Sequence, residues 1–269
     1  MPKTTQGPES VLSTTLSVAP GPIFDTLLRE FDSRFEMLNA DTPELIRQAQ
    51  KIRHQVYCVE NGFEKSSEES EGLETDEFDS RAVQSLLVAR ETRAALGTVR
   101  LIMPLAHAPE RSFAVQRLLD PSSASRLLSL PVHTMAEASR FSISRHFRRL
   151  MSYSEPGEAE AWVTSNSGPM MRLGLFQGLV RMSLQHGITH WCALMEPTLI
   201  RMFSAMSIRF QPIGSLVEFR GLRQPCYIDV YAMLNAVMHE RPAFWQIISA
   251  GGSLRPHLAP LHDEALLNS

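Results

Sequence analysis

The chain has 269 residues, of which 43% are hydrophobic and 20% are charged, and this ordinary globular composition excludes disorder of the whole chain. Its net charge of −3 argues against a protein whose main role is to bind nucleic acid, because such domains are strongly basic. Three scattered cysteines suit neither a disulfide framework nor a zinc site, and no apolar run reaches the roughly 18 residues of a membrane helix. We therefore expect reduced cysteines, no bound metal, no nucleic-acid partner, no integral membrane segment and a cytoplasmic location.

Composition along the chain predicts one domain with two loose ends. Residues 1–20 are rich in Ser, Thr, Pro and Gly, which predicts an arm without fixed structure. Residues 251–269 form a tail with further Gly and Pro. No internal repeat and no long linker lies between them, so residues 21–250 are predicted to form a single domain.

Hydrophobic periodicity and turn residues predict alternating strands and helices. Asp41 or Thr42 can cap a helix whose first turn suits Pro43, and the polar turn RETRA separates two apolar runs that read as an antiparallel hairpin. In chain order, the predicted elements are a strand at Phe35–Leu38, a helix from Pro43 to about Tyr57, a hairpin of Ser85–Ala89 and Leu96–Met103, a strand near Thr134–Ile143, a helix at Gly168–Gly187, a strand at Ile188–Met195, a helix at Pro197–Met206, strands near Ile208–Phe219 and Cys226–Tyr231, and a helical stretch at Ala232–Ile248. This order predicts a mixed α/β sheet covered by helices, and the sequence lacks the glycine-rich motifs of the common nucleotide-binding classes.

Charged residues gather in segments where they would be costly to bury unpaired. Arg53 lies four residues before Tyr57, so the two share a helix face. The segment Glu74–Asp79 has four acids in six residues, a pattern that is more often a solvated loop.

Two predicted strands also contain charges, Arg100 in one and Glu137 with Arg140 in the other. Together with Arg53, these arginines can offset Asp76, Asp79 and Glu137 around one cleft, although such a network can equally be structural. Residues three apart on a regular strand face opposite sides, so a β-bulge between Glu137 and Arg140 is needed for both to face that cleft.

The ordered set of these residues resembles the LuxI-type acyl-homoserine-lactone synthases. It resembles more closely their relatives, the PEP-CTERM/exosortase system-associated acyltransferases and N-acyl amino acid synthases. The resemblance covers roughly Arg34 to Tyr231. The matching residues are Arg53, Tyr57, Phe63, Glu74-x-Asp76-x-Phe78-Asp79, Gly97-x-x-Arg100-Leu101, Ser112-Phe113, Glu137-x-x-Arg140-Phe141, Phe147-Arg148-Arg149, Leu173-Gly174-Leu175-Phe176, Ala193-Leu194-Met195-Glu196-Pro197, Ile213-Gly214 and Glu218-Phe219-x-Gly221-x-Arg223-x-Pro225.

The resemblance implies a GNAT-like acyltransferase fold, with a central mixed, mostly antiparallel sheet flanked by helices. It implies transfer of a fatty acyl chain from a carrier thioester to an amine. Glu137 is then the candidate general base, directly or through a water, and Arg140 is its catalytic partner. Backbone N–H groups near Ala138 and Ser139 are candidates to stabilise the oxyanion. The residues implied in substrate binding are Arg53, Tyr57, Phe63, Asp76, Asp79, Arg100, Phe113, Ser139 and Phe141, with Phe113 on the acyl channel.

Two departures from these families bear on the substrates. The lactone synthases have Phe and Trp where this chain has Tyr57 and Phe63, at positions that border their S-adenosylmethionine site. The loop that binds coenzyme A pyrophosphate in GNAT enzymes is not recognisable after Ile143. The missing loop favours acyl carrier protein as donor, through its phosphopantetheine thioester, with acyl-CoA as the alternative and no tightly bound cofactor. Arg145, Arg148 and Arg149 then form a basic cluster suited to an acidic carrier, although a solvated basic turn explains them equally well.

The leading hypothesis is an N-acyltransferase that moves a medium or long acyl chain from acyl carrier protein to the amine of an amino-acid-like acceptor. A first alternative is an acyl-homoserine-lactone synthase that uses S-adenosylmethionine. A second is a non-catalytic acyl- or carrier-binding protein of an exosortase system.

Overall fold

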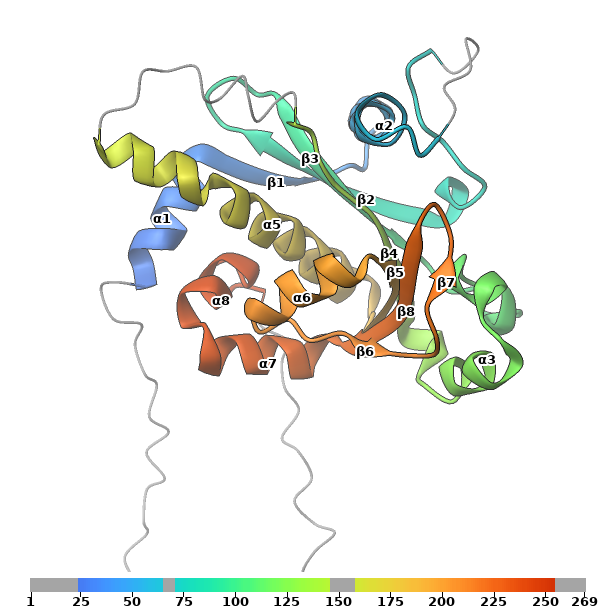
Figure 1. Cartoon of the computed structure of the whole chain (residues 1–269). Coiled ribbons are helices and arrows are strands. Elements are labelled where there is room, and N and C mark those ends of the chain that lie inside the picture. The colour runs from blue at the N-terminus through green and yellow to red at the C-terminus, as the bar shows by residue number, and fades with distance from the viewer. Residues whose placement is uncertain (1–23, 65–70, 146–157, 255–269) are drawn as a thin grey trace, which may run out of the picture.

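The computed structural model describes residues 24–64, 71–145 and 158–254, so the predicted arm at 1–20 and residues 255–269 of the predicted tail lie outside the described residues. Within these ranges, eight strands form a sheet in the order β1-β2-β3-β4-β5-β8-β6, and β7 pairs with β8 (Figure 1). Every neighbouring pair is antiparallel except β4 and β5, which are parallel. The strands are β1 (Phe35–Asn39), β2 (Ala82–Ala89), β3 (Ala95–Ile102), β4 (Met135–Ile143), β5 (His190–Met195), β6 (Gln211–Pro212), β7 (Val217–Glu218) and β8 (Leu222–Asp229).

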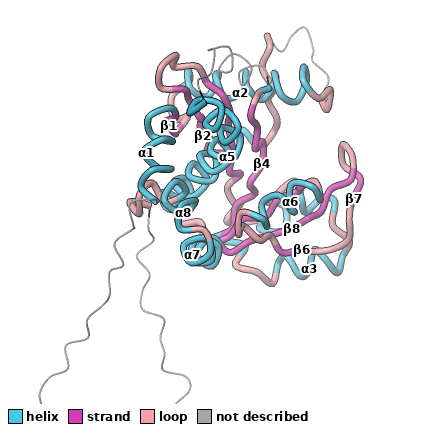
Figure 2. The backbone as a smooth tube through the Cα atoms, turned by 60° about the vertical axis from the view of Figure 1, so that its left-hand side comes forward, coloured by secondary structure: helices cyan, strands magenta, loops and turns pink. Residues whose placement is uncertain are grey.

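Helices cover both faces of this sheet. In Figure 1, α5 crosses one face of the β1–β3 region and α2 lies on the other face. Figure 2 shows β4 in the middle of the molecule, between the part with β1 and β2 and the part with β6 and β8. The helices are α1 (Phe24–Arg34), α2 (Pro43–His54), α3 (Pro121–Leu128), α5 (Glu158–His186), α6 (Pro197–Ala205), α7 (Val230–Glu240) and α8 (Pro242–Ile248). The predicted mixed, mostly antiparallel sheet flanked by helices is confirmed.

Local sequence signals determine where α2 begins. The Thr42 hydroxyl caps the helix by accepting the Leu45 N–H at 3.3 Å, and Pro43 takes the first helical position. Beyond His54 the chain continues as a π-helical stretch, Gln55–Glu60. The helical segment therefore ends slightly beyond the predicted end. Its last residues change from α-helical to π-helical hydrogen bonding, and π-helical turns are frequent at functional sites.

Helix α5 packs closely against α1, β1 and β2. A Cβ at Gly178 would lie 2.7 Å from the Met37 side chain and 2.9 Å from Ser85, and a Cβ at Gly174 would lie 2.8 Å from Phe31. Only glycine at these two positions allows the helix backbone to lie this close to its neighbours.

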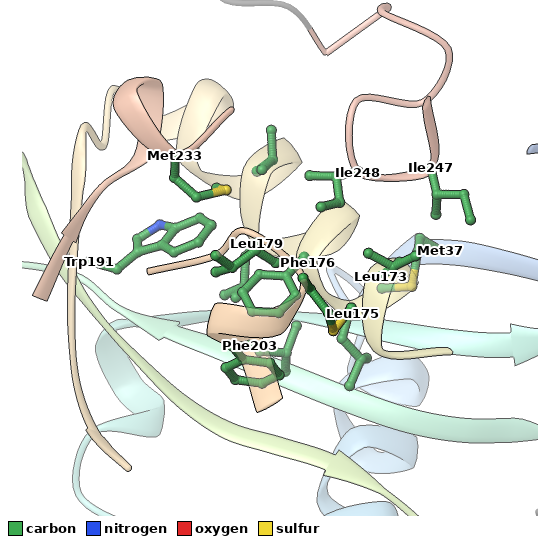
Figure 3. Close-up of a cluster of buried hydrophobic side chains, with 14 of the residues drawn as sticks. Met37, Leu173, Leu175, Phe176, Leu179, Trp191, Phe203, Met233, Ile247 and Ile248 are labelled. Atoms are coloured by element: carbon green, nitrogen blue, oxygen red, sulfur yellow. The ribbon is translucent and has the colours of Figure 1, made fainter. Parts of the chain in front are cut away.

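The main hydrophobic core lies between α5 and the sheet (Figure 3). The Phe176 ring of α5 stacks on Trp191 of β5 at 6.2 Å and meets Phe203 of α6 edge-on at 4.8 Å. All three side chains are at most 1% exposed, and each contributes roughly 1.5–3 kcal/mol by burial. This core fixes the position of β5 relative to β4.

Several predictions of secondary structure were wrong in detail. The helix predicted from Gly168 begins ten residues earlier, at Glu158, and the strand predicted at Cys226–Tyr231 spans Leu222–Asp229. The stretch Ile208–Phe219 is not one strand but contains the two-residue strands β6 and β7, because a turn around Gly214 separates them. The helical stretch Ala232–Ile248 is two helices, since Pro242 cannot continue α7 and begins α8 instead. Among the described residues, no helix is both long and apolar enough to span a bilayer.

Candidate active site

A cleft opens where β4 and β5 part. The two parallel strands pair only between Met135–Glu137 and His190–Cys192, although both continue further. Beyond these pairs, Ala138–Phe141 of β4 and Ala193–Met195 of β5 line a cavity of about 770 Å³. The divergence of two parallel strands therefore creates, in the middle of the sheet, a cavity of the size that small-molecule sites have.

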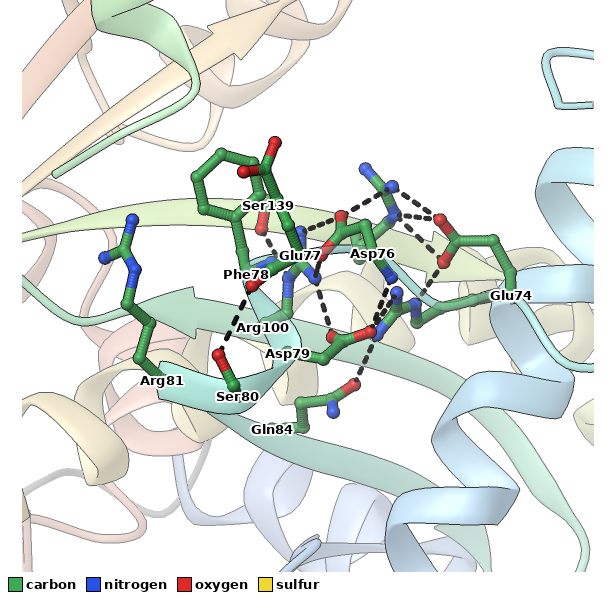
Figure 4. Close-up of polar contacts among 12 residues, drawn as sticks. Glu74, Asp76, Glu77, Phe78, Asp79, Ser80, Arg81, Gln84, Arg100 and Ser139 are labelled. Atoms are coloured by element: carbon green, nitrogen blue, oxygen red, sulfur yellow. Dashed lines mark hydrogen bonds and ion pairs between the residues drawn. The ribbon is translucent and has the colours of Figure 1, made fainter. Parts of the chain in front are cut away.

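An ion network of three arginines and three acids forms and supports one wall of the cavity: Arg53, Arg100, Arg140, Glu74, Asp76 and Asp79 (Figure 4). Arg53 of α2 is completely buried. It donates to Glu74, to both carboxylate oxygens of Asp79 at 2.6 and 3.0 Å, and to Gln84 at 3.2 Å. This arginine attaches the acidic loop to α2 and β2.

The other two arginines of the ion network come from the strands. Arg100 of β3 grips Asp76 through two N–H groups at 2.7 and 2.9 Å and donates to the Ser139 hydroxyl at 3.0 Å. Arg140 of β4 donates to Glu74 at 2.5 Å and to Asp76 at 3.0 Å. The predicted mutual pairing of these arginines with Asp76 and Asp79 is confirmed, and it fixes the loop against both strands.

The pKa values of the three acids of the ion network follow from this pairing. Burial by itself raises the pKa of each carboxyl, but the neighbouring arginines outweigh it. Arg100 and Arg140 hold the pKa of Asp76 at about 2, and the pKa values of Glu74 and Asp79 also lie below their ordinary range. These acids are therefore fixed negative charges at neutral pH and are poor proton acceptors.

Glu137 is a different kind of carboxyl. It is 4% exposed, it lines the cavity, and one of its oxygens accepts the backbone N–H of Val115 at 3.0 Å. Burial raises the pKa of Glu137, and the hydrogen bond from Val115 and the charge of Arg100 offset this only in part. The sequence-based expectation that an arginine would pair with Glu137 is not met by a direct contact, because the ion network uses Glu74 instead. A buried carboxyl with a raised pKa beside a cavity is the type of group that accepts a proton in catalysis.

The predicted irregularity in β4 is present and lies at Arg140 itself. Arg100 pairs with Ser139 and Thr98 pairs with Ser142, so two residues of β4 oppose Val99. Arg140 has a φ of +52°, which is rare for a residue other than glycine. The bulge directs Arg140 to Asp76, which Arg100 also holds, while the Phe141 ring packs against the Phe176 ring at 5.2 Å.

The mouth of the cavity carries arginines stacked on aromatic rings. The Arg140 guanidinium lies 4.9 Å from the centre of the Tyr57 ring, and the Arg223 guanidinium lies 5.7 Å from the centre of the Phe63 ring. The Tyr57 and Phe63 rings lie 6.2 Å apart. These contacts connect the π-helical segment, and the residues just after it, to β4 and β8.

Part of the cavity lining is apolar. It includes Leu199 and the neighbouring rings of Phe141, Phe176, Phe203 and Phe210. The cavity therefore has both a charged part and an apolar part, and the apolar part suits an alkyl chain.

The predicted site residues fall into three groups. Most line the cavity, namely Tyr57, Phe63, Asp76, Arg100, Glu137, Ser139, Arg140 and Phe141. Arg53 and Asp79 belong to the ion network behind the wall. Phe113 does not line the cavity but packs in a separate buried cluster with Phe78 and Ile102, so its predicted place on the acyl channel is not supported.

The predicted carrier-binding arginines are described only in part. Arg145 is exposed, and its side chain donates to Asn61 at 2.5 Å. Arg148 and Arg149 lie outside the described residues.

Sequence reasoning did not assign four residues that the structure places on the cavity: Glu74, Glu196, Arg220 and Arg223. Glu74, Glu196 and Arg223 occur in the motifs quoted above, but no local pattern distinguishes a cavity-lining residue from a solvated one. Their positions depend on the loop before β2 for Glu74, on the junction of β5 and α6 for Glu196, and on the β7–β8 hairpin for the two arginines.

Three comparisons place this geometry among known proteins. Residues 52–154, less than half of the chain, match the family described as "Acetyltransferase (GNAT) domain". No curated protein sequence matches the chain. TofI, solved in a ternary complex with an inhibitor and MTA, has a TM-score of 0.52 at 19% identity, over 78% of this chain and 99% of TofI.

Two further solved structures are similar. BjaI, a CoA-dependent acyl-homoserine lactone synthase solved with SAM and isopentyl-CoA, has a TM-score of 0.51 at 17% identity, over 81% of this chain and 89% of BjaI. FeeM, an N-acyl amino acid synthase from uncultured soil microbes, has a TM-score of 0.48 at 18% identity, over 76% of this chain and 95% of FeeM. The domain match and the first two structures confirm the predicted GNAT fold, and the domain match supports an acyltransferase enzyme. The association with an exosortase system stays a prediction.

Proposed function

We propose that the protein is an N-acyltransferase that moves a medium or long acyl chain from a carrier thioester to the amine of an amino-acid-like acceptor. The observation that carries this proposal is the position of Glu137. It is a buried carboxyl with a raised pKa, at the point where β4 and β5 part, and it lines a cavity that also has ion-paired and apolar side chains in its wall. These features together suit acyl transfer from a fatty acyl thioester to an amine.

In the proposed reaction, the acceptor nitrogen attacks the thioester carbonyl and the carrier thiol leaves. Glu137 takes the proton that the nitrogen must lose, directly or through a water, and the departing thiolate takes up a proton in turn. Arg100 donates to the Ser139 hydroxyl at 3.0 Å, so that hydroxyl retains its own hydrogen to donate into the cavity. Together with backbone N–H groups of β4 beyond its pairing with β5, it is a candidate donor to the oxyanion.

The apolar part of the cavity is the proposed place for the acyl chain. The Phe203 ring centre lies 5.3 Å from that of Phe141 and 6.4 Å from that of Phe210. These three rings line the apolar part of the cavity. Each buried methylene of an alkyl chain contributes about 0.8 kcal/mol, so a chain that fills this part binds far better than an acetyl group. This favours a fatty acyl donor.

The contacts directly after β4 favour acyl carrier protein over coenzyme A as donor. The Glu60 carboxylate accepts the Ser144 hydroxyl at 2.7 Å and the Arg145 backbone N–H at 2.9 Å. The pyrophosphate of coenzyme A bound to the same groups would meet this negative charge, and it is more highly charged than the single phosphodiester of a carrier's phosphopantetheine. The exposed Arg145 beside it offers a contact for an acidic carrier. Coenzyme A remains the alternative donor, since BjaI is CoA-dependent.

The proposal is tested with purified protein and a matrix of donors and acceptors. Decanoyl- and palmitoyl-carrier protein and the matching acyl-CoA species are each mixed with the twenty amino acids, and N-acyl products are detected by mass spectrometry. We expect one or more N-acyl amino acids from the unmodified chain and at least a hundredfold less from Glu137→Gln. The control is Glu240→Gln, an exposed acid paired with Arg209 away from the cavity. Equal product from the unmodified chain and Glu137→Gln contradicts the role of Glu137.

Lactone synthesis is the second candidate, because BjaI has this fold and was solved with SAM. The same matrix with SAM as acceptor decides between them. Acyl-homoserine lactone without N-acyl amino acids would replace the first proposal, whereas no product with any acceptor would favour a binding role.

A further inference from the structure

The β7–β8 hairpin places two arginines on the cavity, Arg220 in its turn and Arg223 at the start of β8. Arg220 and Arg223 both line the cavity, at 30% and 13% side-chain exposure. Arg220 has a φ of +54° and precedes Gly221 with a φ of +90°, so the turn holds the Arg220 backbone in a conformation that residues other than glycine rarely adopt. The hairpin therefore presents these two side chains in a fixed direction.

Aromatic rings hold one face of each guanidinium. Arg220 lies 4.9 Å from the centre of the Phe219 ring, and Arg223 lies 5.7 Å from the centre of the Phe63 ring. Stacking of this kind orients a guanidinium and leaves the N–H groups at its edge available for an anion.

Each of these two arginines pairs with an acid whose side chain is partly exposed to solvent. Arg220 pairs with Glu64, which is 25% exposed, and Arg223 pairs at 3.3 Å with Glu196, which is 48% exposed. In the ion network, by contrast, Arg100 grips Asp76 with two N–H groups. Exposed carboxylates gain little from ion pairing, so a bound anion can replace the half-exposed Glu196 at little cost, and it can share the guanidinium of Arg220 with Glu64.

We propose that Arg220 and Arg223 form an anion-binding subsite that holds an anionic group of one substrate of the acyl transfer. This inference rests on the proposed function for the identity of that substrate. The anion is an oxyanion that accepts from a guanidinium fork, either the carboxylate of the amino-acid acceptor or the phosphate of the phosphopantetheine arm. Glu64 and Glu196 occupy the two arginines before it binds.

The test compares two pairs of probes that differ only in the anion. Phenylalanine and phenethylamine differ in the carboxylate, and decanoyl-phosphopantetheine and decanoyl-pantetheine differ in the phosphate. Dissociation constants are measured by calorimetry for the unmodified chain, Arg223→Gln and Arg220→Gln. The control is Arg209→Gln, which loses an exposed arginine paired with Glu240 outside the cavity. Arg223→Lys retains the charge but not the fork, and should recover part of the binding.

We expect the unmodified chain to prefer the anionic member of one pair at least tenfold, and both Gln variants to lose most of that preference. Discrimination within the amino-acid pair assigns the subsite to the acceptor, and discrimination within the pantetheine pair assigns it to the donor. If neither pair is discriminated, or if the variants weaken both members of a pair equally, the subsite is refuted. Binding is read without turnover, so this outcome is distinct from a failure of the proposed acyl transfer.

Discussion

Replacing Arg53 tests whether the ion network holds the acidic loop in place. Arg53→Met keeps a long side chain and removes the charge, so Glu74 and Asp79 lose a completely buried partner. Removing one partner of a buried ion pair costs about 3–5 kcal/mol. Glu74 retains Arg140 and Asp79 retains Arg100, so we expect the lower end, about 3 kcal/mol. Typical domains have only about 5–15 kcal/mol of stability, so this loss is easily measured.

The assay is urea unfolding followed by tryptophan fluorescence at several pH values. The pKa values of Glu74 and Asp79 are lowered from 4.5 and 3.8, so their pairing stabilises the fold fully above those values and is lost as the pH falls through the lowered ones. The difference between Arg53→Met and the unmodified chain should therefore be largest at pH 7 and shrink toward pH 3. Arg209→Met removes an arginine whose side chain is 51% exposed, and it should change the free energy of unfolding much less. A loss at Arg53 no larger than that at Arg209 would refute this reasoning.

Three further predictions concern the cavity. Because burial raises the pKa of Glu137, its protonated form favours folding, so this contribution is complete below pH 4.5 and is lost as the pH rises through the raised pKa. Glu137→Gln should therefore raise the melting temperature at pH 8 and leave it nearly unchanged at pH 4; calorimetric scans showing a lower value at pH 8 would contradict this. Phe203→Ala should cost about 3–5 kcal/mol in urea unfolding and shift the products toward longer acyl chains, whereas an unchanged chain-length profile by mass spectrometry would place the chain elsewhere. Glu60→Gln should increase kcat/KM for acyl-CoA relative to acyl carrier protein, and an unchanged ratio would remove the argument for donor choice.

The parts of the fold that local chemistry determines were predictable from the sequence. The Thr42 cap, the hairpin of β2 and β3 and the helix of Met171, Leu175 and Leu179 each rest on residues within one or two turns of each other. The two-residue strands β6 and β7 were not separable, because so short a strand is stabilised by its partner β8 and not by its own sequence.

The part of the candidate site that was predictable from the sequence is the ion pairing of the buried arginines. Buried arginines in strands need acids, and the Glu74–Asp79 segment was the available source. Which acid would face which arginine was not predictable, so Glu74 was left out and Glu137 was assigned an arginine it does not contact. Arg223 reaches the cavity because β8 begins there, just before the residues that pair with β5, and no local sequence pattern contains this tertiary arrangement.

The most direct test of the central claim is untargeted lipid mass spectrometry of cells that express the chain, beside cells that express Glu137→Gln at an equal level of folded protein. We predict a new N-acyl species in the first extract and its loss in the second, with fragment masses that identify the acyl chain and the amine. The same new species at equal abundance in both extracts would contradict the account of Glu137 as the base of an N-acyl transfer.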